Sequence, residues 1–527
     1  MDAQSSDDRP AQKHWGLIAA LVVLLVLGAG LRLFDLTDQP IDFHPTRQLR
    51  GLIVARGMYY EMLPAADPQL RSAALAFWAS TGQYEPSILE RFTALTYLLV
   101  GREVFWLARL YNSLFWLIGG LALFDLARRM VSASLGDQGA AAVGALSALA
   151  YYLALSFSVQ ASRAVQPDPG MVVWIILASW AAYRWSENLS WRWALLTGAA
   201  SGLAVLTKAV ALYPVGGMLI ALMLTARRED SARAGSNLFT RLGRIVHSPQ
   251  VWTIAAFTIV PTLLYYVSRS GRASEYFSSW TLALSHLLLQ PETYLRWLNL
   301  VQELTTPFAL ALALLGVLLA RGRAQALLVG LWLGYLVYGL FLPYQMTSHS
   351  YYHLQLVPII ALSLAPLAGR IAVRLRALPK LWQLSAAGAA LFLLACASWQ
   401  ALIPLSSQDY RNEPAYWQQI ASYLPADGKI IALTQDYGYR LMYYGWRKVV
   451  LWPNRGEIKL SVLRGSEKEF LDFFNKRIEG KSYFLITAFG QFADQPELGK
   501  TLNEHFPVIA QGSGYIIFDL LHPLNSG

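Results

Sequence analysis

The sequence predicts an α-helical polytopic membrane protein that ends in a small external α/β domain. Three observations carry this prediction. Of the 527 residues, 55% are hydrophobic and only 14% are charged, and the mean hydropathy is +0.36. Eleven apolar runs approach the roughly 20 residues that a helix needs to cross a hydrocarbon core about 30 Å thick. After residue 402 the composition changes, and short helical and strand-like stretches alternate.

Composition also excludes other classes of protein. So apolar a chain, with 18 Trp and 27 Tyr, lies outside the balance of soluble domains. The net charge of +10 comes from Lys and Arg residues between apolar runs, which is typical of cytoplasmic membrane flanks, so we expect no nucleic-acid partner. The single cysteine, Cys396, lies in an apolar run, which leaves neither a disulfide framework nor a thiolate metal cluster.

The expected helical spans and their orientation follow from hydropathy and loop charge. The candidate spans are residues 15 to 34, 105 to 127, 139 to 158, 170 to 184, 193 to 207, 209 to 225, 251 to 268, 305 to 320, 325 to 343, 355 to 369 and 383 to 402. Basic residues concentrate on alternate loops, which are therefore cytoplasmic together with the N-terminus. We expect a multi-pass protein of the inner (plasma) membrane. The first run is long and is followed by Arg32, which favours a retained anchor over a cleaved signal peptide.

Two external regions are too long to be turns. Residues 35 to 104 contain mixed apolar and charged stretches that fit interfacial helices, and we assign them to a transmembrane domain of residues 1 to 402. Residues 403 to 527 form the second domain, in which WQQIASYLP and EKEFLDFFNKRI are helical and KIIALT, SYFLIT and GYIIFDLL are strand-like. No Gly-rich phosphate fingerprint in a strand, turn and helix context is present there.

The strongest functional signal is ionisable residues at the external ends of the spans, because charge at membrane depth is costly and usually faces a cavity or a partner. Asp42 follows the first span in IDFHPTRQLR, where two nearby prolines favour an extended or turned backbone. A carboxylate there can serve as a general base if Arg47 and Arg50 tune its basicity. The alternative is that Asp42 or Thr46 caps the next helix.

Other external ends supply further candidates. SRAVQPDPG carries Arg163, Gln166 and Asp168, although Pro-Asp-Pro-Gly is also ordinary turn sequence. Lys208 lies in a short link between two spans, where its ammonium either meets a phosphate or snorkels to water. In MTSHSYYHLQLVP, two histidines at i and i+4 share a helix face, but no Glu completes a zincin motif, so we favour a ligand-lining loop without metal. The expected substrate-binding residues are His44, Arg47, Arg163, Lys208, Arg269, Arg272, His349, Tyr351, Tyr352 and His353, with an interfacial anchor as the alternative for Arg269 and Arg272.

These groups suit one reaction. An acceptor hydroxyl or amine attacks an anomeric carbon whose leaving group is a lipid phosphate. The carboxylate takes the proton, and cations stabilise the charge that develops on the phosphate.

The order of motifs also resembles a family. The apolar first span, the acidic residue after it, SRAVQPD, GLAVLTKAVALYP and HSYYHLQLVP look like the C-type (GT-C) membrane glycosyltransferases, and most like the group of protein O-mannosyltransferases and lipid A aminoarabinose transferases. The resemblance covers roughly residues 15 to 370. It implies an inverting transferase that uses a polyprenyl-phosphate sugar on the external face, with an envelope lipid, glycan or protein as acceptor.

Residue roles carry over from the resemblance position by position. Asp42 matches the catalytic acid of the first loop and Asp168 the second external Asp, so these two are the expected catalytic residues. Lys208 matches the lysine at a helix end, and Tyr351 with Tyr352 the aromatic pair near the lipid phosphate. Many relatives have Asp-Glu at the first site, whereas this chain has Asp42 followed by Phe. No cofactor is firmly implied, and a divalent metal stays open.

Two other functions compete with this interpretation. A lipid-linked sugar flippase or another transporter also has charged groups beside a cavity, but it usually carries them near mid-membrane on inverted repeats. A noncatalytic envelope assembly protein would use its C-terminal domain to bind partners, with Asp42 as a helix cap. The identities of the sugar and of the acceptor do not follow from the sequence.

Overall fold

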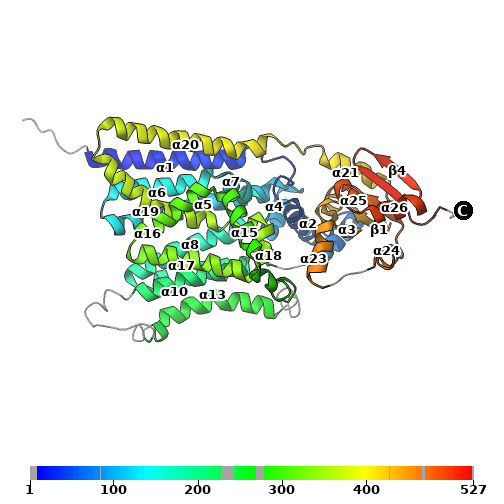
Figure 1. Cartoon of the computed structure of the whole chain (residues 1–527), viewed down its shortest axis with the longest axis horizontal. Coiled ribbons are helices and arrows are strands. Elements are labelled where there is room, and N and C mark those ends of the chain that lie inside the picture. Colours follow the sequence, from blue (N-terminus) through cyan, green and yellow to red (C-terminus); the bar gives the residue numbers. More distant parts are fainter. Residues whose placement is uncertain are drawn as a thin grey trace, which may run out of the picture. The chain divides into compact units, whose positions relative to one another are not determined.

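The computed structural model describes residues 9 to 82, 85 to 226, 243, 245 to 268, 278 to 426, 428 to 465 and 469 to 524. The chain forms two compact units (Figure 1). We call the first the helical unit, which comprises Met1–Leu36, Tyr84–Pro86 and Arg109–Ser407. The second, the mixed unit, comprises Thr37–Gln83, Ser87–Ala108 and Gln408–Gly527.

Long apolar helices dominate the helical unit. Its helices are α1 (Arg9–Leu33), α5 (Trp106–Leu135), α6 (Gln138–Ala154), α7 (Ser156–Arg163), α8 (Asp168–Asn188), α9 (Trp191–Thr207), η1 (Ala209–Ala211), α10 (Leu212–Ala226), α13 (Pro249–Val267), η2 (Ser278–Leu282), η3 (Ser285–Leu289), α15 (Pro291–Thr305), α16 (Pro307–Leu319), α17 (Gly322–Phe341), α18 (Pro343–Ser348), η4 (Ser350–His353), α19 (Leu356–Arg376) and α20 (Lys380–Ser406).

The helices of this unit fit a multi-pass membrane protein. Within the described part of the chain, six helices are long and apolar enough to cross a membrane, and eight if two bent pairs each count as one span. The bent pairs are α6 with α7, at 61°, and α15 with α16, at 95°. The expected number of eleven spans stays a prediction, because α9 and α10 have only 17 and 15 residues. On α20, Leu391, Phe392 and Trp399 are each 68% exposed, which fits a lipid-facing helix.

Small residues let neighbouring helices of this unit pack backbone to backbone. A methyl group at Gly217 on α10 would overlap the carbonyl oxygen of Gly330 on α17. Likewise, a methyl group at Gly144 on α6 would lie 2.6 Å from the carbonyl oxygen of Ala365 on α19. Lipid tails are as apolar as Leu, so close packing rather than hydrophobic burial holds such helices together.

The mixed unit combines the first long loop with the C-terminal segment. Its elements are α2 (Pro45–Glu61), α3 (Pro68–Ser80), α4 (Ile88–Val100), α21 (Glu413–Ser422), β1 (Ile430–Leu433), η5 (Gln435–Gly438), α22 (Tyr439–Tyr444), β2 (Val449–Leu451), α23 (Arg455–Leu463), α24 (Phe470–Ile478), β3 (Tyr483–Ile486), α25 (Phe489–Ala493), α26 (Pro496–His505), β4 (Val508–Gly512) and β5 (Tyr515–Asp519).

A five-stranded mixed sheet organises this unit, in the order β2-β1-β3-β5-β4. Strand β1 pairs in parallel with β2 and β3, whereas β5 pairs antiparallel with β3 and β4. All four residues of β1 are buried, as expected for a central strand that is covered on both faces. Trp452, Phe474, Phe484, Phe506 and Phe518 form the buried aromatic part of the core. The small α/β domain at the C-terminal end of the sequence is therefore confirmed.

The first long loop is helical, as its mixed apolar and charged stretches predicted. In the structure, α2 to α4 group with residues 408 to 527, whereas the sequence analysis assigned residues 35 to 104 to the transmembrane domain. The expected boundary near residue 402 lies close to the end of α20. The assignment of residues 1 to 402 and 403 to 527 as domains stays a prediction.

Candidate active site

A buried ion pair joins two of the candidate residues in the helical unit. Lys208 Nζ donates to Asp168 Oδ1 at 2.7 Å. Asp168 begins α8, and Lys208 lies in the break between α9 and α10, where it has an extended backbone. The two side chains are only 1% and 6% exposed. The ammonium of Lys208 therefore does not snorkel into water, and the carboxylate of Asp168 offsets its charge.

Two aromatic rings cover this ammonium. Lys208 Nζ lies 4.5 Å from the ring centroid of Tyr352 and 5.1 Å from that of Tyr351. Both distances fit cation–π attraction, which strengthens when water is excluded. Asp168, Lys208 and the Tyr351–Tyr352 pair, which are far apart in the sequence, thus form one cluster. We call these four residues the pair cluster.

The segment that carries the two tyrosines is fixed by a buried chain of hydrogen bonds. Nε2 of His353 lies 3.0 Å from the carbonyl oxygen of Met346, so it carries the proton. Nδ1 then accepts from the hydroxyl of Tyr335 at 2.7 Å, and that oxygen accepts from Trp297 Nε1 at 2.8 Å. Both nitrogens of His353 are thereby engaged within the protein. His349 instead lies against the rings of Tyr351 and Tyr352.

The buried arginines of the helical unit bind backbone and hydroxyl groups. Arg163 is 1% exposed and donates to the carbonyl oxygens of Phe34 and Asp35 at 2.6 and 2.9 Å. Arg32, which the sequence analysis did not consider as a site residue, is fully buried and donates to Ser162 Oγ at 2.7 Å. These contacts tie the end of α1 to α7. The expected site residues Arg269 and Arg272 lie outside the described residues.

In the mixed unit, Asp42 is half-buried, and an amide side chain holds it. Gln48 Nε2 donates to Asp42 Oδ1 at 2.9 Å and to the carbonyl oxygen of Phe43 at 2.8 Å. Gln48 itself is fully buried on α2. The N-cap of α2 is His44, which makes no side-chain hydrogen bond at the cap.

His44 has a strained backbone and an altered basicity. Its φ of 46° lies in the left-handed region, which is uncommon for residues other than glycine. Burial, and next the cation of Arg47, lower the pKa of His44 to about 4. At neutral pH the ring of His44 is therefore uncharged. Arg50 points elsewhere and donates to the carbonyl oxygens of Thr81 and Gly82 at 3.3 and 2.7 Å.

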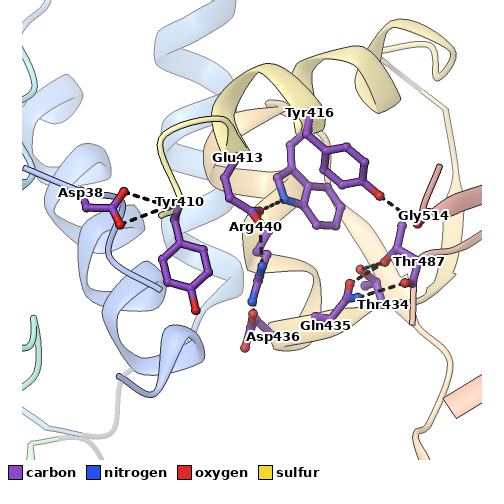
Figure 2. Close-up of polar contacts among 11 residues, drawn as sticks. Asp38, Tyr410, Glu413, Tyr416, Thr434, Gln435, Asp436, Arg440, Thr487 and Gly514 are labelled. Atoms are coloured by element: carbon purple, nitrogen blue, oxygen red, sulfur yellow. Dashed lines mark hydrogen bonds and ion pairs between the residues drawn. The ribbon is translucent and has the colours of Figure 1, made fainter. Parts of the chain in front are cut away.

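The C-terminal segment contacts Asp38, which lies four residues before Asp42 in the sequence (Figure 2). The backbone N–H of Tyr410 donates to both carboxylate oxygens of Asp38, each at 3.1 Å. Burial raises the pKa of the Tyr410 hydroxyl, the Arg440 cation lowers it, and the carboxylates of Asp42, Asp38 and Glu413 raise it further. The hydroxyl therefore keeps its proton at neutral pH.

Polar contacts continue at the carboxyl ends of the parallel strands. Arg440 pairs with Asp436 and, at 3.3 Å, with Glu413, and Figure 2 shows its guanidinium between the two carboxylates. Burial alone would lower the pKa of Arg440, but the two carboxylates raise it overall. The hydroxyl of Thr46, four residues after Asp42, donates to Asp436 Oδ1 at 3.1 Å. Thus the Asp42 segment and the strand ends form one polar region.

Metal ligands do not gather in the described residues. Across those ranges, no group of three or more His, Cys, Asp or Glu side chains is placed to hold a metal ion. The histidine pair His349 and His353 serves ring contacts and a hydrogen-bond chain instead.

Several partner residues escaped the sequence analysis. Gln48, Tyr335, Gln355 and Tyr410 each contact or neighbour a candidate residue, yet none of them was a candidate in the sequence analysis. Gln355 carried the only usable signal, because an amide inside the apolar run HLQLVP is costly unless it has a partner. Nothing in the sequence singled out Gln48 or Tyr410.

Comparisons with known proteins identify the fold as that of the C-type membrane glycosyltransferases, which the order of motifs predicted. Residues 85–252 match the family model described as dolichyl-phosphate-mannose-protein mannosyltransferase. That segment is less than half of the chain. No curated protein matches the chain in sequence.

Solved structures match nearly the whole chain. The crystal structure of ArnT from Cupriavidus metallidurans bound to undecaprenyl phosphate has 16% sequence identity and a TM-score of 0.54, covering 96% of this chain and 98% of that chain. Its apo state gives 16% identity and a TM-score of 0.56, covering 97% and 98%. The apo oligosaccharyltransferase of Archaeoglobus fulgidus gives 12% identity and a TM-score of 0.52, covering 97% of this chain and 74% of that chain. Together with the apolar helices, these matches describe a multi-pass membrane protein.

Proposed function

We propose that this protein is an inverting glycosyltransferase that moves a sugar from a polyprenyl-phosphate donor to an envelope lipid, glycan or protein. The observation that carries the proposal is the fold, which matches ArnT over nearly the full length of both chains. That relative was crystallised with undecaprenyl phosphate, a donor-type lipid. The matched mannosyltransferase model likewise describes an enzyme family that uses a lipid phosphate sugar.

The pair cluster supports a lipid-phosphate donor. A single ammonium, held at 2.7 Å by Asp168 and covered by two tyrosine rings, is a fixed positive group with little access to water. Such a group stabilises the negative charge that develops on a departing phosphate without having to reorganise. In this proposal Lys208 serves the phosphate, and Asp168 holds Lys208 in place.

Asp42 is the proposed general base. As the acceptor oxygen or nitrogen bonds to the anomeric carbon, its proton passes to the carboxylate of Asp42. The bond between that carbon and the phosphate oxygen breaks, and its electron pair leaves with the phosphate. Because Gln48 holds one carboxylate oxygen, the carboxylate has a defined orientation for this transfer.

The location follows from the charges of the loops. We place the protein in the inner membrane with its N-terminus in the cytoplasm and its C-terminal segment outside, where the donor lipid and the acceptor meet. No role is assigned to a metal ion.

Substitution of Asp42 tests the proposal. In proteoliposomes supplied with lipid-linked sugar from the native membrane, Asp42→Asn should lower the rate of sugar transfer by about 10²- to 10⁴-fold, the usual contribution of a general base. Binding of undecaprenyl phosphate should stay unchanged. The matched control is Asp67→Asn in the same loop, because Asp67 caps α3 and Asn also caps well. Transfer by Asp42→Asn at the wild-type rate would refute the assigned base.

A further inference from the structure

Beside the pair cluster, several buried side chains have unused hydrogen-bonding atoms. Among the described residues, Asp168 Oδ2, both amide atoms of Gln166 and Oε1 of Gln355 are buried without a hydrogen-bond partner. These three residues are each 1% exposed. Buried polar atoms are paired in the great majority of cases, so these four orphaned atoms need an explanation.

The residues that carry these atoms either contact members of the pair cluster or lie close to them in the sequence. Gln166 lies two residues before Asp168, whose other oxygen binds Lys208. The ammonium of Lys208 faces the ring of Tyr352, and the carbonyl oxygen of Tyr352 accepts from Gln355 Nε2 at 3.4 Å. The orphaned atoms therefore belong to a member of the pair cluster, Asp168, and to two residues that neighbour its members in the sequence.

The orphaned atoms are mostly acceptors. Gln355 must direct its NH₂ group to the carbonyl oxygen of Tyr352, which leaves its Oε1 as an acceptor. Asp168 Oδ2 is an acceptor when the carboxylate is charged, as its pairing with Lys208 requires. Gln166 offers one acceptor and one donor, whichever way its amide is turned. The four orphaned atoms thus comprise three acceptors and one donor.

A phosphate cannot fill this set, because an ionised phosphate only accepts hydrogen bonds. The missing partner must instead bring O–H or N–H hydrogens. Resting on the proposed function, we infer that Gln166, Asp168 and Gln355 bind the sugar ring of the donor through its hydroxyl or amino groups. Lys208 then binds the phosphate, and these three residues determine which sugar the protein accepts. Sites built to pair with a substrate hydroxyl discriminate strongly, because an analogue without it leaves their own buried groups unpaired.

The test separates sugar binding from phosphate binding. Full-length protein in nanodiscs is titrated with undecaprenyl phosphate and with undecaprenyl phosphates that carry glucose, mannose or an aminopentose. Wild type should bind at least one sugar-bearing lipid more tightly than the bare phosphate. Gln166→Leu and Gln355→Leu should each weaken that binding about 5- to 30-fold, as expected for one buried hydrogen bond, and change binding of the bare phosphate less than about twofold.

A matched control and a stability readout complete the design. Gln160→Leu, on the neighbouring helix α7, replaces an amide that already donates to Ser156 Oγ, and it should change neither affinity. Without lipid, Gln166→Leu should unfold at the same temperature as wild type or higher, because it removes two unpaired buried atoms. A purely structural glutamine would lower that temperature.

Three results would overturn the inference: equal weakening of all lipids by both variants, unchanged sugar affinity in both variants, or no preference of wild type for any sugar-bearing lipid. Failure of the proposed function looks different. In that case the sugar-dependent affinity and its loss in Gln166→Leu persist, but no sugar is transferred. Conversely, sugar transfer together with unchanged sugar affinity in both variants would support the proposed function and refute the proposed sugar site.

Discussion

Arg56 and Glu103 form a doubly hydrogen-bonded ion pair in the mixed unit. Arg56 Nε donates to both carboxylate oxygens of Glu103, at 3.0 and 2.9 Å. The guanidinium also lies 4.2 and 4.3 Å from the ring centroids of Tyr443 and Trp446 and donates to the carbonyl oxygen of Tyr443 at 2.7 Å. One side chain of α2 therefore binds residues that come almost 400 positions later in the chain.

Loss of this arginine should destabilise the mixed unit. The side chains of Arg56 and Glu103 are 7% and 20% exposed, so Arg56→Leu leaves a poorly hydrated carboxylate and removes the cation between two rings. We expect a loss of about 3 to 5 kcal/mol in the free energy of unfolding, measured by chemical denaturation in detergent. The matched control is Arg455→Leu, which breaks an exposed pair with Asp494 and should cost at most about 1 kcal/mol. Equal effects of the two substitutions would contradict this account.

Gln48 should influence turnover through Asp42. Gln48→Leu removes the amide that donates to Asp42 Oδ1, so the charged carboxylate loses a stabilising donor and its fixed orientation. We expect kcat to fall about 10-fold or more with little change in KM, and the acidic limb of the pH profile of kcat to move to higher pH. Gln69→Leu, on the exposed first turn of α3, is the control. A fall in stability without any shift of the pH profile would make Gln48 merely structural.

Features that depend on neighbouring residues could be predicted from the sequence, whereas contacts between distant residues could not. Strands β1 and β5 were predicted because KIIALT and GYIIFDLL are apolar runs rich in β-branched residues. Strand β2 was missed, because Val449–Leu451 has only three residues, too few to show an alternating pattern. Local patterns gave the type of element where the pattern was long enough.

Pairings between distant residues were beyond local patterns. The sequence singled out Asp168 and Lys208 separately, from the cost of charge near a membrane, but nothing in either segment indicates that they bind each other. The grouping of α2 with the C-terminal segment rests on contacts such as that of Arg56 with Tyr443, which only the folded chain reveals. The charged candidates and the pair Tyr351 and Tyr352 were therefore predictable as single residues, whereas the partner that each of them binds was not.

His44 should make the mixed unit sensitive to acid. Its pKa in the folded protein is about 4, below the ordinary value of 6.5, so the folded state resists a proton that the unfolded chain accepts. The resulting stability is complete above pH 6.5 and is lost as the pH falls to about 4. By the standard conversion of pKa shifts, it amounts to about 3 kcal/mol.

A comparison of variants isolates this contribution. His44→Asn keeps a residue that tolerates positive φ, so its free energy of unfolding should change less between pH 7 and pH 4 than that of wild type. His505→Asn, at an exposed histidine of α26, should follow wild type across the same range. If wild type and His44→Asn lost stability in parallel, protonation of His44 would play no part.

The seam between α10 and α17 should tolerate no added methyl group at Gly217. A Cβ there would overlap the carbonyl oxygen of Gly330, which is rigid backbone, so Gly217→Ala must push the two helices apart. We expect a cost of about 1 to 3 kcal/mol, seen as a lower thermal midpoint in detergent. Gly216→Ala is a control one residue away, because a Cβ at Gly216 meets nothing within 4 Å. It should leave the midpoint unchanged or raise it, since alanine favours helix more than glycine does. Equal midpoints for the two variants would mean that the helices do not approach as closely as this seam requires.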